Sequence, residues 1–144
     1  MTVKTAYWDA SAVVALCTPD VGTVSARRLA RVYSMVTWWA TPVEVQSALA
    51  RHIREQSVPE ETLDIANQHL RILRAGWREI EPSEQVRDIA ESLPGPYEVR
   101  AGDALQLAAA LVWCKRRPKN RPFVCFDRRL VEAASRLGFD VLGA

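Results

Sequence analysis

Cysteine and long apolar runs are both scarce in this chain of 144 residues. The three cysteines, Cys17, Cys114 and Cys125, form no CxxC pair and so give no indication of a zinc or redox site. Each lies in an apolar stretch, and we expect buried structural thiols. No apolar run approaches the roughly 18 residues that a membrane span needs. The first ten residues also lack the basic region and apolar core of a signal peptide. We therefore expect a cytoplasmic protein that does not enter a membrane.

Two further sequence features are absent, and each absence argues against a class of enzyme. No glycine-rich phosphate loop is present, which argues against a nucleotide-dependent enzyme. The two histidines, His52 and His69, fall on helical faces with no serine or cysteine nucleophile motif nearby, so we interpret both as packing or surface residues. The formal net charge is only +2, so overall charge does not indicate a nucleic-acid partner.

What the chain does contain is a regular alternation of short apolar segments and amphipathic ones. Hydrophobic residues make up 49% of the chain, which is ordinary for a globular protein, and no linker divides residues 1–144, so we expect one domain. The pattern predicts the α/β class, with a short, mainly parallel central sheet flanked by helices. Predicted strands cover residues 3–8, 35–39, 77–80, 123–126 and 139–142. Predicted helices cover residues 10–17, 21–33, 42–55, a segment after the turn 57–59, and residues 83–93, 102–113 and 128–137.

Four acids follow predicted strands or open predicted helices. Asp9 and Asp127 each close a strand, whereas Glu44 and Asp103 lie in the first turn of a helix. In open α/β folds, ligands bind beyond the carboxyl ends of the strands, where such helices begin. We therefore expect these acids to lie at one edge of the sheet.

Each acid also has a purely structural interpretation. Asp9 and Asp127 suit the N-cap position of the helix that follows them, and Asp103 would stabilise the positive end of its helix dipole. Glu44 fits a capping box with Thr41 as the N-cap residue. Taken together, however, the four carboxylates would repel one another unless a cation lay between them. A donor set of carboxylates without histidine or cysteine favours Mg²⁺ or Mn²⁺ over zinc.

The local sequences around the acids are more specific than their spacing. They are Asp9-Ala10-Ser11-Ala12, Glu44-Val45-Gln46-Ser47-Ala48-Leu49, Arg100-Ala101-Gly102-Asp103-Ala104-Leu105-Gln106-Leu107-Ala108 and Phe126-Asp127-Arg128-Arg129-Leu130. In this order, over nearly the whole chain, they resemble the four acidic motifs of PIN-domain ribonucleases, particularly the VapC-type toxins of toxin–antitoxin pairs. Two positions depart from the family pattern: Cys125 replaces a common Ser or Thr, and Gly102 replaces a larger apolar residue.

The resemblance implies a metal-dependent endoribonuclease with a PIN-like fold. Separately, the apolar faces of the third and fourth predicted helices, with a short turn between them, predict a helical hairpin. The resemblance also implies that Asp9, Glu44, Asp103 and Asp127 hold Mg²⁺ or Mn²⁺ and that Ser11 assists the first acid or a water molecule. Asp9 and Asp103 would be the main ligands, and the other two acids would complete the site or hold a second ion. The implied partners are an RNA substrate, a cognate antitoxin protein and a second copy of the chain in a homodimer.

Basic residues are candidates for contacts with the RNA backbone, which give affinity without sequence choice. They lie at Arg27, Arg28 and Arg31, between Lys115 and Arg121, and at Arg128 and Arg129. The same residues could equally serve solubility or helix dipoles.

Two alternatives stay open at this point. The chain could be a PIN-like interaction module that docks a protein partner on its helical hairpin, with little or no nuclease activity. It could also be a phosphotransfer enzyme that uses Asp9 as its nucleophile, although Ser11 stands where a second Asp would be expected.

Overall fold

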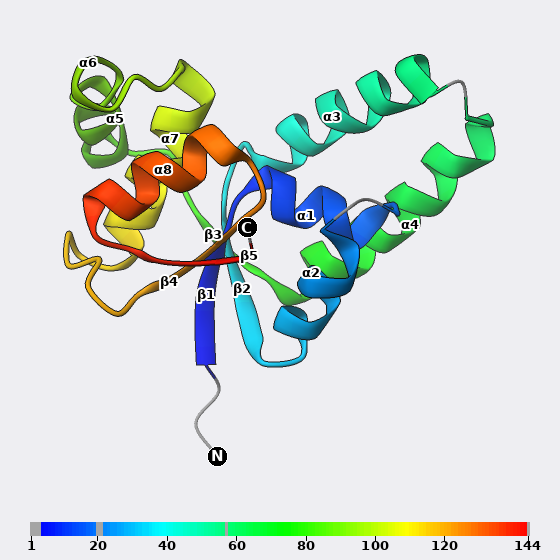
Figure 1. The fold of residues 1–144 in the computed structure, drawn as a ribbon, viewed down its shortest axis with the longest axis horizontal. Helices are drawn as coiled ribbons and strands as arrows, with labels where there is room; N and C mark the ends of the chain where they lie inside the picture. Colours follow the sequence, from blue (N-terminus) through cyan, green and yellow to red (C-terminus); the bar gives the residue numbers. More distant parts are fainter. Residues whose placement is uncertain (1–3, 20–21, 57, 144) are drawn as a thin grey trace.

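The computed structural model of the protein describes residues 4–19, 22–56 and 58–143, and its centre is a parallel sheet (Figure 1). The strands of the described residues are β1 (Lys4–Trp8), β2 (Tyr33–Trp38), β3 (Arg78–Ile80), β4 (Pro122–Cys125) and β5 (Asp140–Gly143). They lie in the order β3-β2-β1-β4-β5, and every neighbouring pair is parallel. The predicted α/β class is confirmed, and the sheet is parallel throughout its described strands rather than only mainly so.

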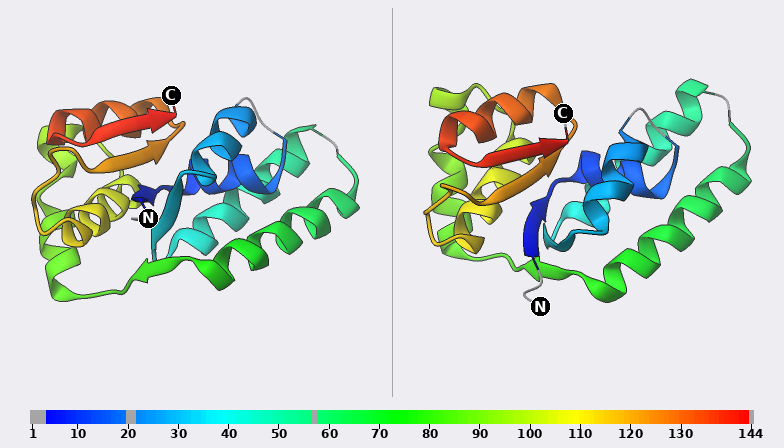
Figure 2. Two further views of the ribbon diagram at one scale, coloured as in Figure 1. Left: turned by 90° about the horizontal axis from the view of Figure 1, so that it is seen from below. Right: turned by 60° about the horizontal axis from the view of Figure 1, so that its bottom comes forward.

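Helices cover both faces of this sheet (Figure 2). They are α1 (Ala10–Cys17), α2 (Thr23–Ala30), α3 (Thr41–Gln56), α4 (Glu60–Gly76), α5 (Glu84–Glu91), α6 (Pro94–Tyr97), α7 (Ala101–Trp113) and α8 (Arg128–Leu137). Alternate side chains of β1 enter two different cores: Ala6 and Trp8 pack with α1 to α4, whereas Tyr7 packs with α5, α7 and α8. A strand segment buried on both faces has no polar side to present, which explains why the three buried residues of β1, Ala6, Tyr7 and Trp8, are consecutive non-charged, mainly apolar residues.

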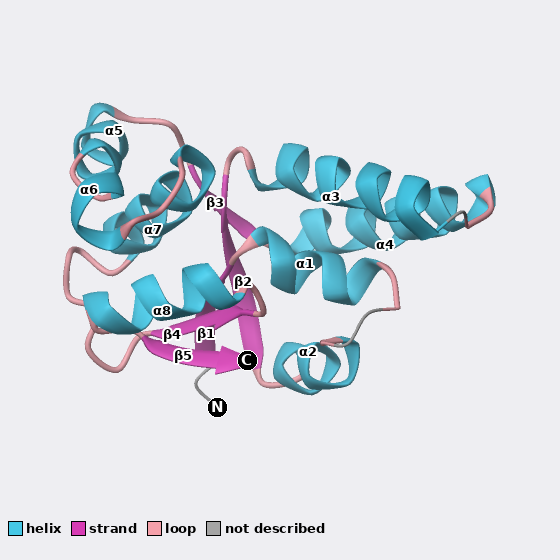
Figure 3. Cartoon of the chain, turned by 45° about the horizontal axis from the view of Figure 1, so that its top comes forward, coloured by secondary structure: helices cyan, strands magenta, loops and turns pink. Residues whose placement is uncertain are grey.

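The third and fourth helices form the expected hairpin, whose far end extends away from the sheet (Figure 3). Its inner part is anchored by Leu49 of α3 and Leu70 of α4, both buried in the core that includes α1. Gln46 Nε2 donates a hydrogen bond to Asn67 Oδ1 at 2.5 Å and so joins the two helices. Ile65 and Ile72 of α4 remain exposed.

Most predicted boundaries agree with the structure to within two residues, and the main exception is α2. The predicted helix over residues 21–33 ends at Ala30, because Tyr33 already pairs with Lys4 in the parallel ladder between β1 and β2. The predicted turn at residues 94–96 is part of the short helix α6. Residues 3, 20, 21 and 57, which the sequence predicts to be strand, turn, helix and turn, lie outside the described residues.

Gly138 ends α8 as predicted, with a φ of 111° that favours glycine. Within the described ranges, no helix combines the length and the apolar character needed to cross a membrane.

Candidate active site

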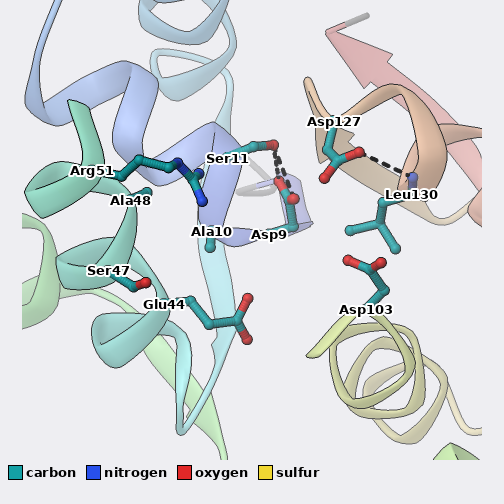
Figure 4. Close-up of a pocket in the computed structure, with 10 residues that line it drawn as sticks. All are labelled: Asp9, Ala10, Ser11, Glu44, Ser47, Ala48, Arg51, Asp103, Asp127 and Leu130. Atoms are coloured by element: carbon teal, nitrogen blue, oxygen red, sulfur yellow. Dashed lines mark hydrogen bonds between the residues drawn. The ribbon is translucent and has the colours of Figure 1, made fainter. Parts of the chain in front are cut away.

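All five predicted site residues line one cavity of about 270 Å³ at the carboxyl edge of the sheet. Asp9 follows β1 and Asp127 follows β4, while Glu44 and Asp103 lie in the first turns of α3 and α7. In Figure 4 the four carboxylates point toward a common space, with Ser11 beside Asp9. The topology creates this arrangement because parallel strands end, and their following helices begin, at the same edge.

Asp9 is the most deeply buried of the four acids, at 3% exposure. Its Oδ1 accepts a hydrogen bond from the Ala12 backbone N–H at 3.1 Å, so the predicted N-cap of α1 is confirmed. The Ser11 hydroxyl lies 2.7 Å and 2.9 Å from the two Asp9 carboxylate oxygens and donates to them. Burial nevertheless raises the pKa of Asp9 to about 6, and the donors from Ser11 and Ala12 oppose this rise.

Ser11 also joins the chain that follows β1 to the chain that follows β4. Its Oγ accepts a hydrogen bond from the Phe126 backbone N–H at 2.9 Å, directly after β4. The position of the Asp9 carboxylate is therefore fixed by atoms from α1 and, through Ser11, by the chain that leads to Asp127.

Asp127 is exposed and caps α8, as predicted. Its Oδ1 accepts from the backbone N–H groups of Arg129 at 3.0 Å and Leu130 at 3.4 Å. Asp103 is half-buried, and its pKa is raised by burial and then by the nearby Asp127 charge. Both carboxylates line the same cavity.

Glu44 does not belong to a capping box, so that structural interpretation is wrong. The Thr41 hydroxyl accepts from the Trp38 backbone N–H at 3.1 Å, and the Glu44 N–H bonds to the Ala40 carbonyl at 3.2 Å. The Glu44 carboxylate instead faces the cavity, where Oε1 accepts from Gln106 Nε2 at 3.2 Å. Burial raises the pKa of Glu44 to about 7, and the charges of Asp9 and Asp103 add to the rise.

Gln106 is a residue of the site that was not predicted from the sequence. It lies on α7 at 1% exposure, where its Oε1 accepts a hydrogen bond from the Tyr7 hydroxyl. Its Nε2 lies 3.2 Å from both Thr41 Oγ1 and Glu44 Oε1. The available signal was a single amide among the apolar residues that follow Asp103 in α7, because a buried polar side chain needs hydrogen-bond partners.

Cys125 and Gly102, the two positions that depart from the motif pattern, have small structural consequences. Cys125 is buried, with Sγ 3.8 Å from Ser11 Oγ, and burial raises its thiol pKa, so the thiol stays neutral. Gly102 lies inside α7, which begins one residue earlier at Ala101, and a Cβ there would meet Glu44 only at 4.0 Å. All three cysteines are buried and free, as predicted.

Carboxylates are the donors that Mg²⁺ and Mn²⁺ prefer, and four of them share this cavity. The raised pKa values of Asp9, Glu44 and Asp103 indicate that negative charge here is poorly compensated, which a bound cation would correct. As the side chains stand, no three acidic, histidine or cysteine residues in the described part of the chain are arranged to hold one metal ion. The donor chemistry fits a hard divalent cation, and binding would require the carboxylates to draw closer together.

Two of the three predicted groups of basic residues differ in their distance from the acids. Arg128 and Arg129 directly follow Asp127, and the Arg129 charge lowers the pKa of Asp103. The basic loop between α7 and β4, residues 114–121, lies at the opposite end of α7 from Asp103, about 20 Å away along a helix of this length. This loop therefore does not flank the acids.

His69 is exposed, with Nδ1 3.3 Å from the Leu16 carbonyl oxygen, and His52 is half-buried on α3. Neither contributes to the acidic cavity.

Comparison with models of known protein families finds no match, and neither does comparison with curated protein sequences. The resemblance to PIN-domain ribonucleases therefore stays a prediction made from the motifs of this sequence.

Proposed function

We propose that this chain is a metal-dependent endoribonuclease and the toxin component of a toxin–antitoxin pair. The observation that carries the proposal is the convergence of four carboxylates, from four separate segments, in one cavity at the carboxyl edge of the sheet. Proteins seldom gather like charges in this way without a function for them, because each buried charge destabilises the others. The toxin assignment, the antitoxin and the homodimer rest on the motif resemblance, and the cytoplasmic location rests on the sequence pattern alone.

In this proposal Asp9 and Asp103 are the main metal ligands, and Glu44 and Asp127 complete the set. A bound Mg²⁺ or Mn²⁺ would activate water and neutralise charge on the phosphodiester. Ser11 holds the Asp9 carboxylate in place through its hydroxyl, and Gln106 orients Glu44 through its amide. Arg128 and Arg129 are placed to contact the RNA backbone beside Asp127. Hydrolysis would form a P–O bond to the attacking water oxygen, which loses a proton to solvent, and break the P–O bond to the leaving oxygen, which takes up a proton from solvent.

The test uses purified wild-type protein and Asp103→Asn, incubated with total cellular RNA in Mg²⁺, in Mn²⁺ and in EDTA. We expect discrete cleavage by the wild type that EDTA abolishes and that Asp103→Asn lacks, and sequencing of the 5′ ends identifies the sites. Asp140→Asn, at an exposed position on β5, is the matched control and should cleave like the wild type. Full activity of Asp103→Asn at saturating Mg²⁺ would refute the assigned site.

A second candidate function is a protein-interaction module with a PIN-like fold. It is favoured by the exposed Ile65 and Ile72 on α4, at 53% and 72% exposure, and by carboxylates that are not arranged to hold one ion in the described residues. Calorimetric titration with Mn²⁺ separates the two functions, because an interaction module has no need for metal affinity that depends on Asp9 and Asp103.

A further inference from the structure

A second cleft, of about 330 Å³, adjoins the acidic cavity on the side of α1 and α3. Its walls include Val14 of α1, His52 of α3 and Phe126, which follows β4. The acidic cavity and the second cleft are continuous, because they share three lining residues, Ser11, Ala48 and Arg51. A ligand whose reacting group lies among the carboxylates can therefore extend into the second cleft without leaving the surface.

Arg51 lies at the junction of the two hollows. It is the single basic side chain among the described residues that line the acidic cavity. Figure 4 shows its side chain reaching from α3 toward Ser11 at the start of α1. Its guanidinium forms no hydrogen bond or ion pair with another described residue, so all of its donors are available to a ligand. An unpaired arginine beside four carboxylates is suited to hold an anion that must approach them.

Phe126 supplies an aromatic wall whose position is tightly set. A Cβ on Gly22 would lie 2.8 Å from the ring, and a Cβ on Gly143 would lie 3.0 Å from it, so only glycine allows the backbone to approach this closely at both places. The Phe126 N–H also donates to Ser11 Oγ, which in turn donates to Asp9. The backbone of Phe126 is thus joined through Ser11 to the most buried acid, and its ring packs closely against Gly22 and Gly143.

We propose that this cleft binds the nucleotide next to the scissile phosphate, with Arg51 on a backbone phosphate and Phe126 packed against the base. This inference rests on the proposed function, since it takes the acidic cavity as the place where RNA is cut. Arginine and an aromatic ring are the usual pair for a single-stranded nucleotide. A base can enter the cleft only when it is unpaired, so the substrate class is a single-stranded segment or loop of RNA.

The test measures RNA binding separately from cleavage. Fluorescence anisotropy with a short labelled single-stranded RNA of mixed sequence is recorded on the Asp103→Asn background in Mg²⁺, so that the probe stays intact. We expect Arg51→Gln to raise Kd about tenfold and to reduce the salt slope by about 0.7, the value for one phosphate contact on a single strand. Phe126→Leu should raise Kd about fivefold or more through lost stacking. Arg54→Gln, an exposed arginine on the same helix, should change Kd less than twofold.

Two further measurements separate the possible outcomes. Arg51→Lys should keep the salt slope while recovering only part of the affinity, because lysine retains the charge but not the planar fork. Sequencing of cleavage ends on the Phe126→Leu enzyme should show a changed base preference next to the cut. A thermal melt verifies that each variant is folded, and if Phe126→Leu is not, the Arg51 variants decide.

The outcomes distinguish this inference from the proposed function. If the wild type cleaves RNA but the Arg51 and Phe126 variants bind and cut as it does, the cleft assignment is wrong and the nuclease assignment holds. If the variants weaken binding but the wild type cuts no RNA, the cleft is an RNA site and the nuclease assignment fails. If the Asp103→Asn protein does not bind RNA and the wild type does not cut it, both are overturned.

Discussion

The two sides of the acidic cavity hold their carboxylates in different ways. On the Asp9 side (Asp9, Ser11 and Asp127), both acids accept hydrogen bonds from backbone N–H groups two or three residues further along the chain. On the Glu44 side (Glu44 and Gln106), the carboxylate accepts from a side-chain amide 62 residues away in sequence. The Asp9 side uses local backbone donors, and the Glu44 side uses a contact between two helices.

This difference has consequences for stability. Backbone donors at a helix start exist wherever the helix forms, so the Asp9 side depends on few other side chains. The Glu44 side depends on Gln106, which also holds the Tyr7 hydroxyl and Thr41. Burial raises the pKa to about 6 for Asp9 and to about 7 for Glu44, so both sides carry negative charge poorly without a cation.

The largest expected effect is a pH dependence of stability in the absence of metal. Because the folded-state pKa values of Asp9 and Glu44 lie above the ordinary values of 3.8 and 4.5, the folded protein binds more protons than the unfolded chain between about pH 4 and 7. Stability in EDTA should therefore fall as pH rises, by about 2–4 kcal/mol between pH 5 and 8. Urea unfolding at constant ionic strength measures this.

Two controls test whether the fall in stability with rising pH comes from the acidic cavity. Glu44→Gln should remove most of the change in stability between pH 6 and 8. Glu44, whose pKa is raised to about 7, loses its proton in that pH range. Saturating Mg²⁺ should stabilise the protein more at pH 8 than at pH 5, since metal binding requires deprotonated carboxylates. A metal-free stability that stays level or rises from pH 5 to 8 in the wild type would contradict the assignment.

The next effect should come from Gln106→Leu, which breaks the Glu44 side alone. It leaves the Tyr7 hydroxyl buried without its partner, and we expect a loss of about 2–3 kcal/mol in the free energy of unfolding. Because the Gln106 hydrogen bond lowers the pKa of Glu44, the acidic limb of the cleavage–pH profile should also move to higher pH. Gln85→Leu, at an exposed position on α5, is the control. An unchanged pH profile would show that Gln106 does not position Glu44.

The smallest effect should come from Ser11→Ala, which weakens the Asp9 side. The Phe126 N–H loses its acceptor and Asp9 loses one donor, for a cost of about 1–2 kcal/mol. The pKa of Asp9 should rise above about 6, because the Ser11 hydrogen bond lowers it. Urea unfolding measures the stability, with Ser135→Ala at an exposed position on α8 as the comparison. If Ser11→Ala costs as much as Gln106→Leu, the two sides do not differ in the way described.

Much of the Asp9 side could be predicted from the sequence, whereas most of the Glu44 side could not. An acid directly before a helix caps it through atoms a few residues away, so the caps at Asp9 and Asp127 follow from local sequence. The same local reasoning was wrong for Glu44, because the Thr41 hydroxyl bonds to the Trp38 N–H and to Gln106. No local pattern shows that α7 will bring an amide beside α3.

Sequence alone determined the α/β class, the order of strands and helices, and the presence of four acids at helix starts, because strand and helix periodicity and capping act over short stretches of chain. Only the tertiary structure decided what surrounds those acids. In the tertiary structure Gln106 donates to Glu44, and the basic loop of residues 114–121 lies at the far end of α7. Arg51 and Phe126 line a cleft beside Ser11. These contacts depend on how helices pack across the sheet, which side-chain volume and burial decide over the whole chain.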